Sequence, residues 1–227
     1  DEVDAGDLIT QGNVWAFTTD SQSGEFLAYD ATSQTSIDLG TPTITREPNK
    51  VTYQCQGGNI EISARFIQNG PFLRIHGTVE NLVQDERGIV LQYIQPLLES
   101  PSVFSNELDR SEWVTINTSS QIEGNLYPIA AMCGDNTGMA VAIGPSEPRL
   151  FGVTGGTEGL GMTFYLGLSP QTLNFPDTAS FDFILYRVDP DWGFRDALNK
   201  YYSFYPDYYK VRPENDGMLM IQLEGKA

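Results

Sequence analysis

The sequence predicts an all-β fold, a large two-sheet antiparallel β-sandwich that carries one C-terminal α-helix. Short apolar runs rich in β-branched and aromatic residues recur from Val14 to about Val188. Turn sequences such as QNGP, DERG, DNTG and PSEP separate these runs at short intervals. No helical pattern interrupts them, which excludes a parallel sheet built from βαβ units.

The strands are expected wherever apolar and polar residues alternate or β-branched and aromatic residues cluster. In chain order they fall in residues 13–19, 24–31, 35–39, 50–56, 59–68, 72–81, 88–98, 127–133, 138–144, 149–154, 161–168 and 179–188. The sequence DNTG between the eighth and ninth runs is typical of a hairpin turn. About a dozen strands in one domain require two packed sheets.

The last strand carries the strongest pattern. In SFDFILYRV, Phe181, Phe183 and Leu185 share one face, while Asp182, Ile184, Tyr186 and Val188 share the other. Both faces are largely apolar, which indicates a strand covered by other elements on both sides.

The helix is expected directly after this strand. Asp189 is the expected N-cap, followed by Pro190 in the first turn, and Pro206 is expected to end the helix. Its apolar stripe at helical spacing consists of Phe194, Ala197, Leu198, Tyr201 and Phe204 or Tyr205. We expect this stripe to pack on the sandwich.

Charge and composition limit the classes of partner. The 227 residues include 30 acidic and 13 basic side chains, a formal net charge of −17. Such a surface repels nucleic acid and anionic lipid headgroups, so neither nucleic acid nor a membrane is an expected partner. A neutral glycan or a cation such as calcium remains compatible. Cys55 and Cys133 are interpreted as small buried hydrophobes, with a disulfide between them as the alternative.

The sequence contains no recognisable catalytic motif, so no catalytic or metal-binding residue is assigned. His76 is the one histidine, in a strand, and is expected to be a hydrogen-bonded strand residue. The glycine-rich TGGTEGLG lacks the P-loop lysine. Oxygen-rich loops at 3–7 and 105–112 are compatible with calcium, although solvated acidic loops are favoured.

Aromatic side chains are the remaining binding candidates, because sugar rings stack on Trp and Tyr. Trp113 lies in a polar region between loop and strand and is the first candidate for a surface platform. Trp15 lies in an alternating strand. Trp192 is expected to anchor the start of the helix. The tyrosines at 201–209 are expected to dock the helix or to face a following domain.

The stretch DPDWGFRDALNKYYSFYPDYYKVRPENDGM resembles the junction between sandwich and barrel in multi-domain bacterial glycoside hydrolases. Upstream, FLRIHGTVEN, YPIAAMCGDNTGMAVAIGPSEPRL and LGLSP are similar to the β-supersandwich, or galactose-mutarotase-like, body of those proteins. The resemblance implies a supersandwich at 1–188, a helix and connector at 189–212 and a link to a missing catalytic domain at 213–227. It also implies that Tyr127 and Arg149 line a groove. The paired histidines of mutarotases have no counterpart here.

Together these observations predict a non-catalytic carbohydrate-binding or carbohydrate-associated module of a secreted or cell-surface glycoside hydrolase. The expected ligand is a polysaccharide or oligosaccharide, the expected partner is a C-terminal catalytic domain, and no cofactor is expected. The site residues are Trp113, Trp15, Tyr127 and Arg149. The alternatives are a brace domain without a ligand, and a sugar-acting enzyme of epimerase-like or hydrolase type. An exposed aromatic row on a sheet favours binding, a carboxylate pair in a pocket favours catalysis, and an apolar patch around the helix favours the brace.

Overall fold

The fold is the all-β sandwich that the sequence predicts. The computed structural model describes residues 24–96, 102–116, 121–124, 127–146, 149–173 and 176–210. Among them no helix is long and apolar enough to cross a membrane. The elements are β1 (Glu25–Asp30), β2 (Thr35–Ile37), β3 (Thr43–Glu47), β4 (Lys50–Gly57), β5 (Ile60–Asn69), β6 (Phe72–Asn81), β7 (Arg87–Gln95), β8 (Ser102–Ser105), η1 (Arg110–Glu112), β9 (Val114–Ile116), β10 (Gln121–Gly124), β11 (Ile129–Cys133), β12 (Gly138–Ala142), β13 (Phe151–Gly156), β14 (Gly159–Leu168), β15 (Thr178–Arg187) and α2 (Phe194–Phe204).

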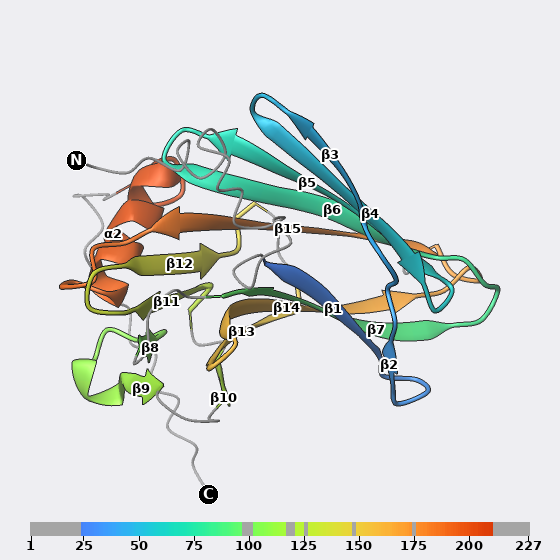
Figure 1. The fold of residues 1–227 in the computed structure, drawn as a ribbon, viewed down its shortest axis with the longest axis horizontal. Helices are drawn as coiled ribbons and strands as arrows, with labels where there is room; N and C mark the ends of the chain where they lie inside the picture. Colours follow the sequence, from blue (N-terminus) through green and yellow to red (C-terminus); the bar gives the residue numbers. More distant parts are fainter. Residues whose placement is uncertain are drawn as a thin grey trace, which may run out of the picture.

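The described strands form two antiparallel sheets that pack face to face (Figure 1). The six-stranded sheet has the order β10-β13-β14-β7-β1-β2, and the nine-stranded sheet has the order β3-β4-β5-β6-β15-β12-β11-β8-β9. The expected DNTG hairpin joins β11 to β12, and Gly134 N donates to Thr137 O at 2.8 Å. The main core lies between the sheets.

Strand β1 shows how the alternating pattern divides the two faces of the six-stranded sheet. Phe26 and Ala28 point into the core, while Leu27 and Tyr29 point outward. The ring of Phe26 contacts the rings of Tyr93 and of Phe181, with centroids 5.1 and 5.6 Å apart. Aromatic side chains from both sheets therefore interlock in the core.

Strand β15 is covered on both faces, as its sequence predicts. Phe181, Phe183 and Leu185 belong to the core between the sheets. Ile184 and Tyr186 belong to a second core on the outer face of the nine-stranded sheet, beneath α2. In Figure 1, α2 lies over the β11 and β12 end of this sheet, away from β3 and β4.

Helix α2 begins four residues later than expected, at Phe194 with Gly193 as its N-cap, so the prediction of an Asp189 N-cap is wrong. Residues 189–193 form a turn in which Asp189 O accepts from Gly193 N at 2.8 Å. Gly193 has φ 53°, a conformation that a helix cannot contain. The end of the helix before Pro206 is confirmed, as is the buried stripe of Phe194, Ala197, Leu198 and Tyr201.

Two buried hydroxyl groups fix α2 on the sheet. Tyr186 Oη donates to Ala197 O at 2.9 Å, and Tyr201 Oη donates to Ile143 O at 2.8 Å. Both rings are almost fully buried, so each bond also satisfies a polar group that would otherwise be costly to bury. The helix is therefore an integral layer of the fold.

The sequence patterns missed four short strands, namely β3, β8, β9 and β10. They have three to five residues each, too few for alternation to be distinctive. Cys55 and Cys133 are both free and buried, which confirms their interpretation as small hydrophobes. Cys55 lies in the core between the sheets and Cys133 in the core beneath α2.

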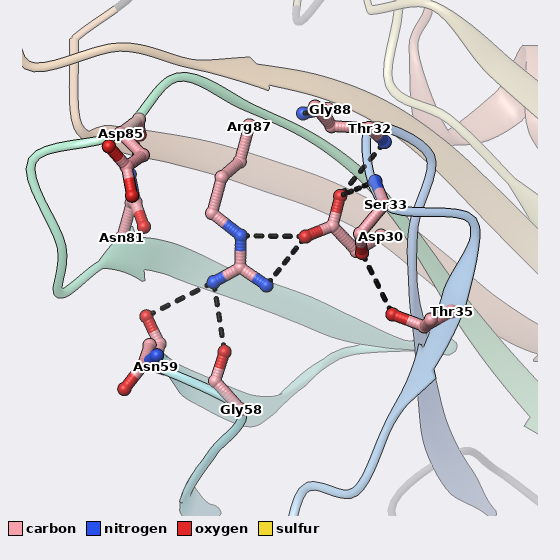
Figure 2. Close-up of polar contacts among 10 residues, drawn as sticks. All are labelled: Asp30, Thr32, Ser33, Thr35, Gly58, Asn59, Asn81, Asp85, Arg87 and Gly88. Atoms are coloured by element: carbon pink, nitrogen blue, oxygen red, sulfur yellow. Dashed lines mark hydrogen bonds and ion pairs between the residues drawn. The ribbon is translucent and has the colours of Figure 1, made fainter.

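An ion pair between Asp30 and Arg87 ties the two sheets together at one end (Figure 2). The Arg87 Nε and Nη2 atoms lie 2.9 and 2.8 Å from Asp30 Oδ2, joining β1 to β7. Arg87 Nη1 donates to Gly58 O at 2.9 Å, in the turn between β4 and β5 of the other sheet. Asp30 Oδ1 accepts from the backbone of Thr32 and Ser33. Both side chains are largely buried.

Replacing Asp30 by Ala should lower the free energy of unfolding by about 3 kcal/mol, because Arg87 would remain buried without its anion. The matched control is Glu47→Ala, which removes the exposed pair with Lys50 and should cost less than about 1 kcal/mol. Urea denaturation followed by fluorescence measures both. Equal losses in the two variants would contradict this assignment.

The acid dependence of stability should also depend on Asp30. Burial by itself would raise the pKa of Asp30, but the Ser33 and Thr32 amides and the Arg87 guanidinium outweigh it and lower the pKa. The stability that this carboxylate contributes is present above its unfolded pKa of about 3.9 and is lost as the pH falls through the lower folded value. Urea midpoints between pH 7 and pH 2 should therefore fall less steeply below about pH 4 for Asp30→Asn than for the parent.

Candidate functional site

Trp113 lies between the β8–β9 hairpin and the start of α2. Asp109 caps η1 by accepting from Ser111 N at 2.9 Å, so this carboxylate is already engaged. The Trp113 Nε1 atom donates to Glu107 O at 2.8 Å. The guanidinium groups of Arg110 and Arg195 lie 5.3 and 5.8 Å from the ring centroid, within cation–π range. The indole is therefore held in one orientation.

A cavity of about 390 Å³ opens beside the half-buried Trp113 ring. Its polar lining comes from Arg110, Thr115, Asp135 and Asp191. Gly193 also lines the cavity, and a Cβ atom built there would lie 3.0 Å from the Trp113 ring. Because two guanidinium groups and the helix start already contact the indole, stacking of a sugar on Trp113 stays a prediction.

The expected role of Trp192 as the anchor of the helix start is wrong. Its side chain is 61% exposed and does not line the Trp113 cavity. Trp113 packs against the core beneath α2 instead, from a distant part of the chain. No local pattern indicates this contact, because it depends on how the β8–β9 hairpin folds back.

The other predicted binding residues are divided between places. Tyr127 packs edge-on against Phe194, with ring centroids 5.5 Å apart, and is half-buried against the core beneath α2. It therefore contacts the helix and does not line the Trp113 cavity. Trp15 lies outside the described residues, as do the oxygen-rich loop at 3–7 and the expected link at 213–227. In the described part of the chain, no group of three His, Cys, Asp or Glu side chains could hold a metal ion.

Arg149 lines a second, larger groove of about 690 Å³. The groove lies where the connection from β12 to β13 passes the beginning of β15 and the end of β14. Arg149 Nη2 donates to Ser180 Oγ at 2.5 Å. Val90, Leu150 and Tyr165 supply much of the remaining lining. An apolar groove of this size with a few fixed polar groups has the character of a ligand site.

An aromatic row runs from this groove across the outer face of the six-stranded sheet. Tyr29 pairs with Val90, and Val90 pairs with Tyr165, so their side chains share one face. Tyr29 is 39% exposed and Tyr165 is 38% exposed. Tyr165 Oη donates to Glu123 Oε1 at 2.6 Å, and this bond raises the pKa of Tyr165 to about 12. We call Tyr29, Val90 and Tyr165 the tyrosine row.

The sequence predictions missed the tyrosine row. Each tyrosine occupies an outward position of its strand, and this pattern in the sequence could have predicted that each ring is exposed. Their proximity depends on the pairing of β1, β7 and β14, which are far apart in the sequence. The structure thus brings Arg149 and Tyr165 into one groove, whereas Trp113 lines the other cavity and Tyr127 lines neither.

No protein-family model matches the sequence, and no curated protein matches it. Three distant similarities to solved structures concern proteins named for sugars. A polysaccharide lyase has a TM-score of 0.45 and 14% identity. The match covers 85% of this chain and 30% of the lyase chain. A galactose mutarotase related enzyme from Lactobacillus acidophilus has a TM-score of 0.36 and 8% identity. The match covers 66% of this chain and 72% of that enzyme. The GH36 alpha-galactosidase AgaA from Geobacillus stearothermophilus has a TM-score of 0.41 and 9% identity. The match covers 77% of this chain and 30% of the alpha-galactosidase.

The chain thus spans about a third of the lyase and of the alpha-galactosidase. Similarity at these TM-scores does not assign an activity, a ligand or a family to this chain. The two cavities and the side chains that line them are therefore the features from which a function can be inferred.

Replacing Gly193 by Ala should destabilise the protein more than the same change at Gly70. Both glycines have positive φ, 53° and 60°, so each alanine carries backbone strain of about 1–2 kcal/mol. At Gly70 a new Cβ meets nothing within 4 Å, whereas at Gly193 it meets the Trp113 ring. Thermal unfolding should show a larger loss for Gly193→Ala and a shifted tryptophan emission. Equal losses would mean that Trp113 does not contact the helix start.

Proposed function

We propose that this chain is a non-catalytic carbohydrate-binding module that holds a glycan on the tyrosine row and in the Arg149 groove. Its wider setting would be a secreted or cell-surface glycoside hydrolase, with a catalytic domain as the partner of the module. The observation that carries the proposal is the pair of exposed tyrosines on one sheet face beside a groove of about 690 Å³.

The spacing of the two rings suits a chain of sugars. Tyr29 and Tyr165 are two strands apart, which corresponds to about 9.6 Å. A glycan that crosses the strands can place two nearby sugar units on the two rings, and the smaller apolar side chain of Val90 lies between these rings. Because Tyr165 is fixed by Glu123, little side-chain entropy is lost when a sugar stacks on it.

Polar groups flank the row in positions where sugar hydroxyls need partners. Gln92 Nε2 donates to Thr154 Oγ1 at 3.2 Å on the same sheet face, and Glu123 accepts from Tyr165. Arg149 borders the groove. Both donors and acceptors are therefore available around an apolar platform, which is the usual composition of a sugar site.

A brace role is the second candidate, and the tyrosines at the end of α2 favour it. Tyr202, Tyr208 and Tyr209 are exposed, and the rings of Tyr202 and Tyr209 lie 4.5 Å apart. Exposed aromatic clusters often mark protein–protein interfaces. This surface fits a neighbouring domain better than a glycan, because it lies on a helix end and lines neither of the two grooves described above.

Replacing Tyr165 by Ala should weaken glycan binding about tenfold or more, because a stacked ring would be lost. Calorimetry against soluble xylans, glucans, mannans and galactans measures the effect. Tyr165→Phe keeps the ring and should retain most of the affinity. The matched control is Tyr202→Ala, which removes an equally exposed tyrosine from the helix surface.

The outcomes separate the candidates. No binding by the folded parent across the panel would overturn the glycan proposal and leave the brace. Binding that Tyr202→Ala or Trp113→Ala abolishes, while Tyr165→Ala retains it, would place the site elsewhere. Trp113→Ala requires a parallel unfolding measurement, since that ring also holds the β8–β9 hairpin on the helix.

A further inference from the structure

The nine-stranded sheet has an open half that none of the preceding sites uses. Helix α2 covers β11, β12, the C-terminal half of β15 and Phe72 at the start of β6, whereas Arg65, Arg74 and His76 on the outer faces of β5 and β6 are exposed. Across this open half, Arg65 pairs with His76, and His76 pairs with Asp182. Arg74 occupies the next outward position along β6. We call Arg65, Arg74, His76 and Asp182 the basic strip.

Asp182 is the fixed centre of the strip. Its side chain is almost fully buried at the border of α2. Arg74 donates to Asp182 Oδ2 from Nε at 2.8 Å, and Arg74 Nη2 lies 2.8 Å from the same oxygen. His76 Nδ1 lies 3.1 Å from it as well, which confirms the expectation of a hydrogen-bonded strand histidine. A carboxylate oxygen accepts such bonds, so this geometry fits an Nδ1 atom that carries a proton, and the His76 side chain is 46% exposed.

The strip is positively charged on a strongly acidic protein. With neutral His76, the two arginines and Asp182 sum to one positive charge, against −17 for the chain. The side chain of Arg65 is exposed and makes no ion pair or hydrogen bond within the described residues. The nearest acidic side chain on the same face of β6 is Glu80, four residues from His76 and thus about 13 Å away. Lys50, on the same face, is already neutralised by Glu47.

The arrangement leaves guanidinium hydrogen-bond donors unused. Arg74 binds Asp182 through Nε and Nη2, so Nη1 remains to contact a second anion. All the N–H donors of the Arg65 guanidinium group are available for an anion. Planar guanidinium forks match the two oxygens of a carboxylate or sulfate, and such charge-assisted bonds are about twice as strong as neutral ones. Arg74, held in place by Asp182, and the unpaired Arg65 beside an imidazole therefore favour an oxyanion over a neutral group.

We propose that the basic strip binds an oxyanion, the carboxylate or sulfate group of an acidic glycan. That the oxyanion belongs to a glycan rests on the proposed function, whereas the oxyanion site itself does not. Ser180, which accepts from Arg149 in the groove, lies two residues before Asp182 on the same face of β15. A glycan held in the groove thus has its acidic substituent within reach of the strip.

The test is calorimetry of the full chain at low ionic strength with three probes. Trigalacturonate supplies carboxylates, dextran sulfate oligomers supply sulfates, and uncharged dextran oligomers supply neither. Arg65→Gln should weaken the bound acidic probe about tenfold or more, through loss of a charge-assisted contact. Lys50→Gln is the matched control, since it removes an equal charge from the same face and should change affinity less than about twofold.

Arg65 is exposed and without an ion pair among the described residues, so its replacement should not disturb folding; thermal unfolding checks this. Binding of trigalacturonate alone assigns a carboxylate site, and binding of dextran sulfate alone assigns a sulfate site. Three results would overturn the proposal: no binding of either acidic probe, full affinity in Arg65→Gln, or equal losses in Arg65→Gln and Lys50→Gln. Tyr165→Ala leaves the strip intact, so acidic probes should bind it as they bind the parent. If the folded parent binds an acidic probe but no neutral glycan, the proposed function is overturned and the oxyanion site remains.

Discussion

The structure depends on the burial of β15 on both faces. Phe183 on its inner face packs against the aromatic core between the sheets, and Tyr186 on its outer face hydrogen-bonds the backbone of α2. One strand thus joins three layers, the six-stranded sheet, the nine-stranded sheet and the helix. A strand with two apolar faces has no stable position at a surface. The helix that follows β15 in sequence covers the face that would otherwise be exposed, and this places the second core.

The cover that α2 supplies is incomplete, and the basic strip begins where this cover ends. Along the outer face of β15, Tyr186 and Ile184 lie beneath the helix, and Asp182 lies at its border. Ser180 comes next and contacts Arg149. The same strand therefore changes from apolar to polar within a few residues. A buried carboxylate at such a border needs partners, and Arg74 supplies two donors from the neighbouring strand. The border fixes polar groups that a fully solvated sheet face would leave free.

The sequence allowed the layers to be predicted better than the site. Alternation in β15 and the stripe on α2 are local patterns, and each predicted its own burial correctly. The start of α2 depends on Gly193, whose positive φ is stabilised in a turn against a distant tryptophan, so local capping signals pointed to Asp189 instead. The tyrosine row depends on the pairing of Val90 with Tyr29 and Tyr165, which are 61 and 75 residues away in the sequence. The basic strip depends on the pairing of His76 with Asp182, 106 residues away. No local pattern specifies which strands become neighbours.

The aromatic side chains also show why residue type alone does not identify a stacking site. A stacking ring must be accessible and must be held in place, because an unfixed ring loses entropy on binding. Trp113 is held by its indole N–H and two arginines, but those contacts occupy much of the ring. Trp192 is accessible, yet it has no ring partner within the described residues. Tyr165 meets both conditions, since its face is open while Glu123 fixes its hydroxyl. The combination of exposure and a fixed orientation therefore favours the tyrosine over either tryptophan.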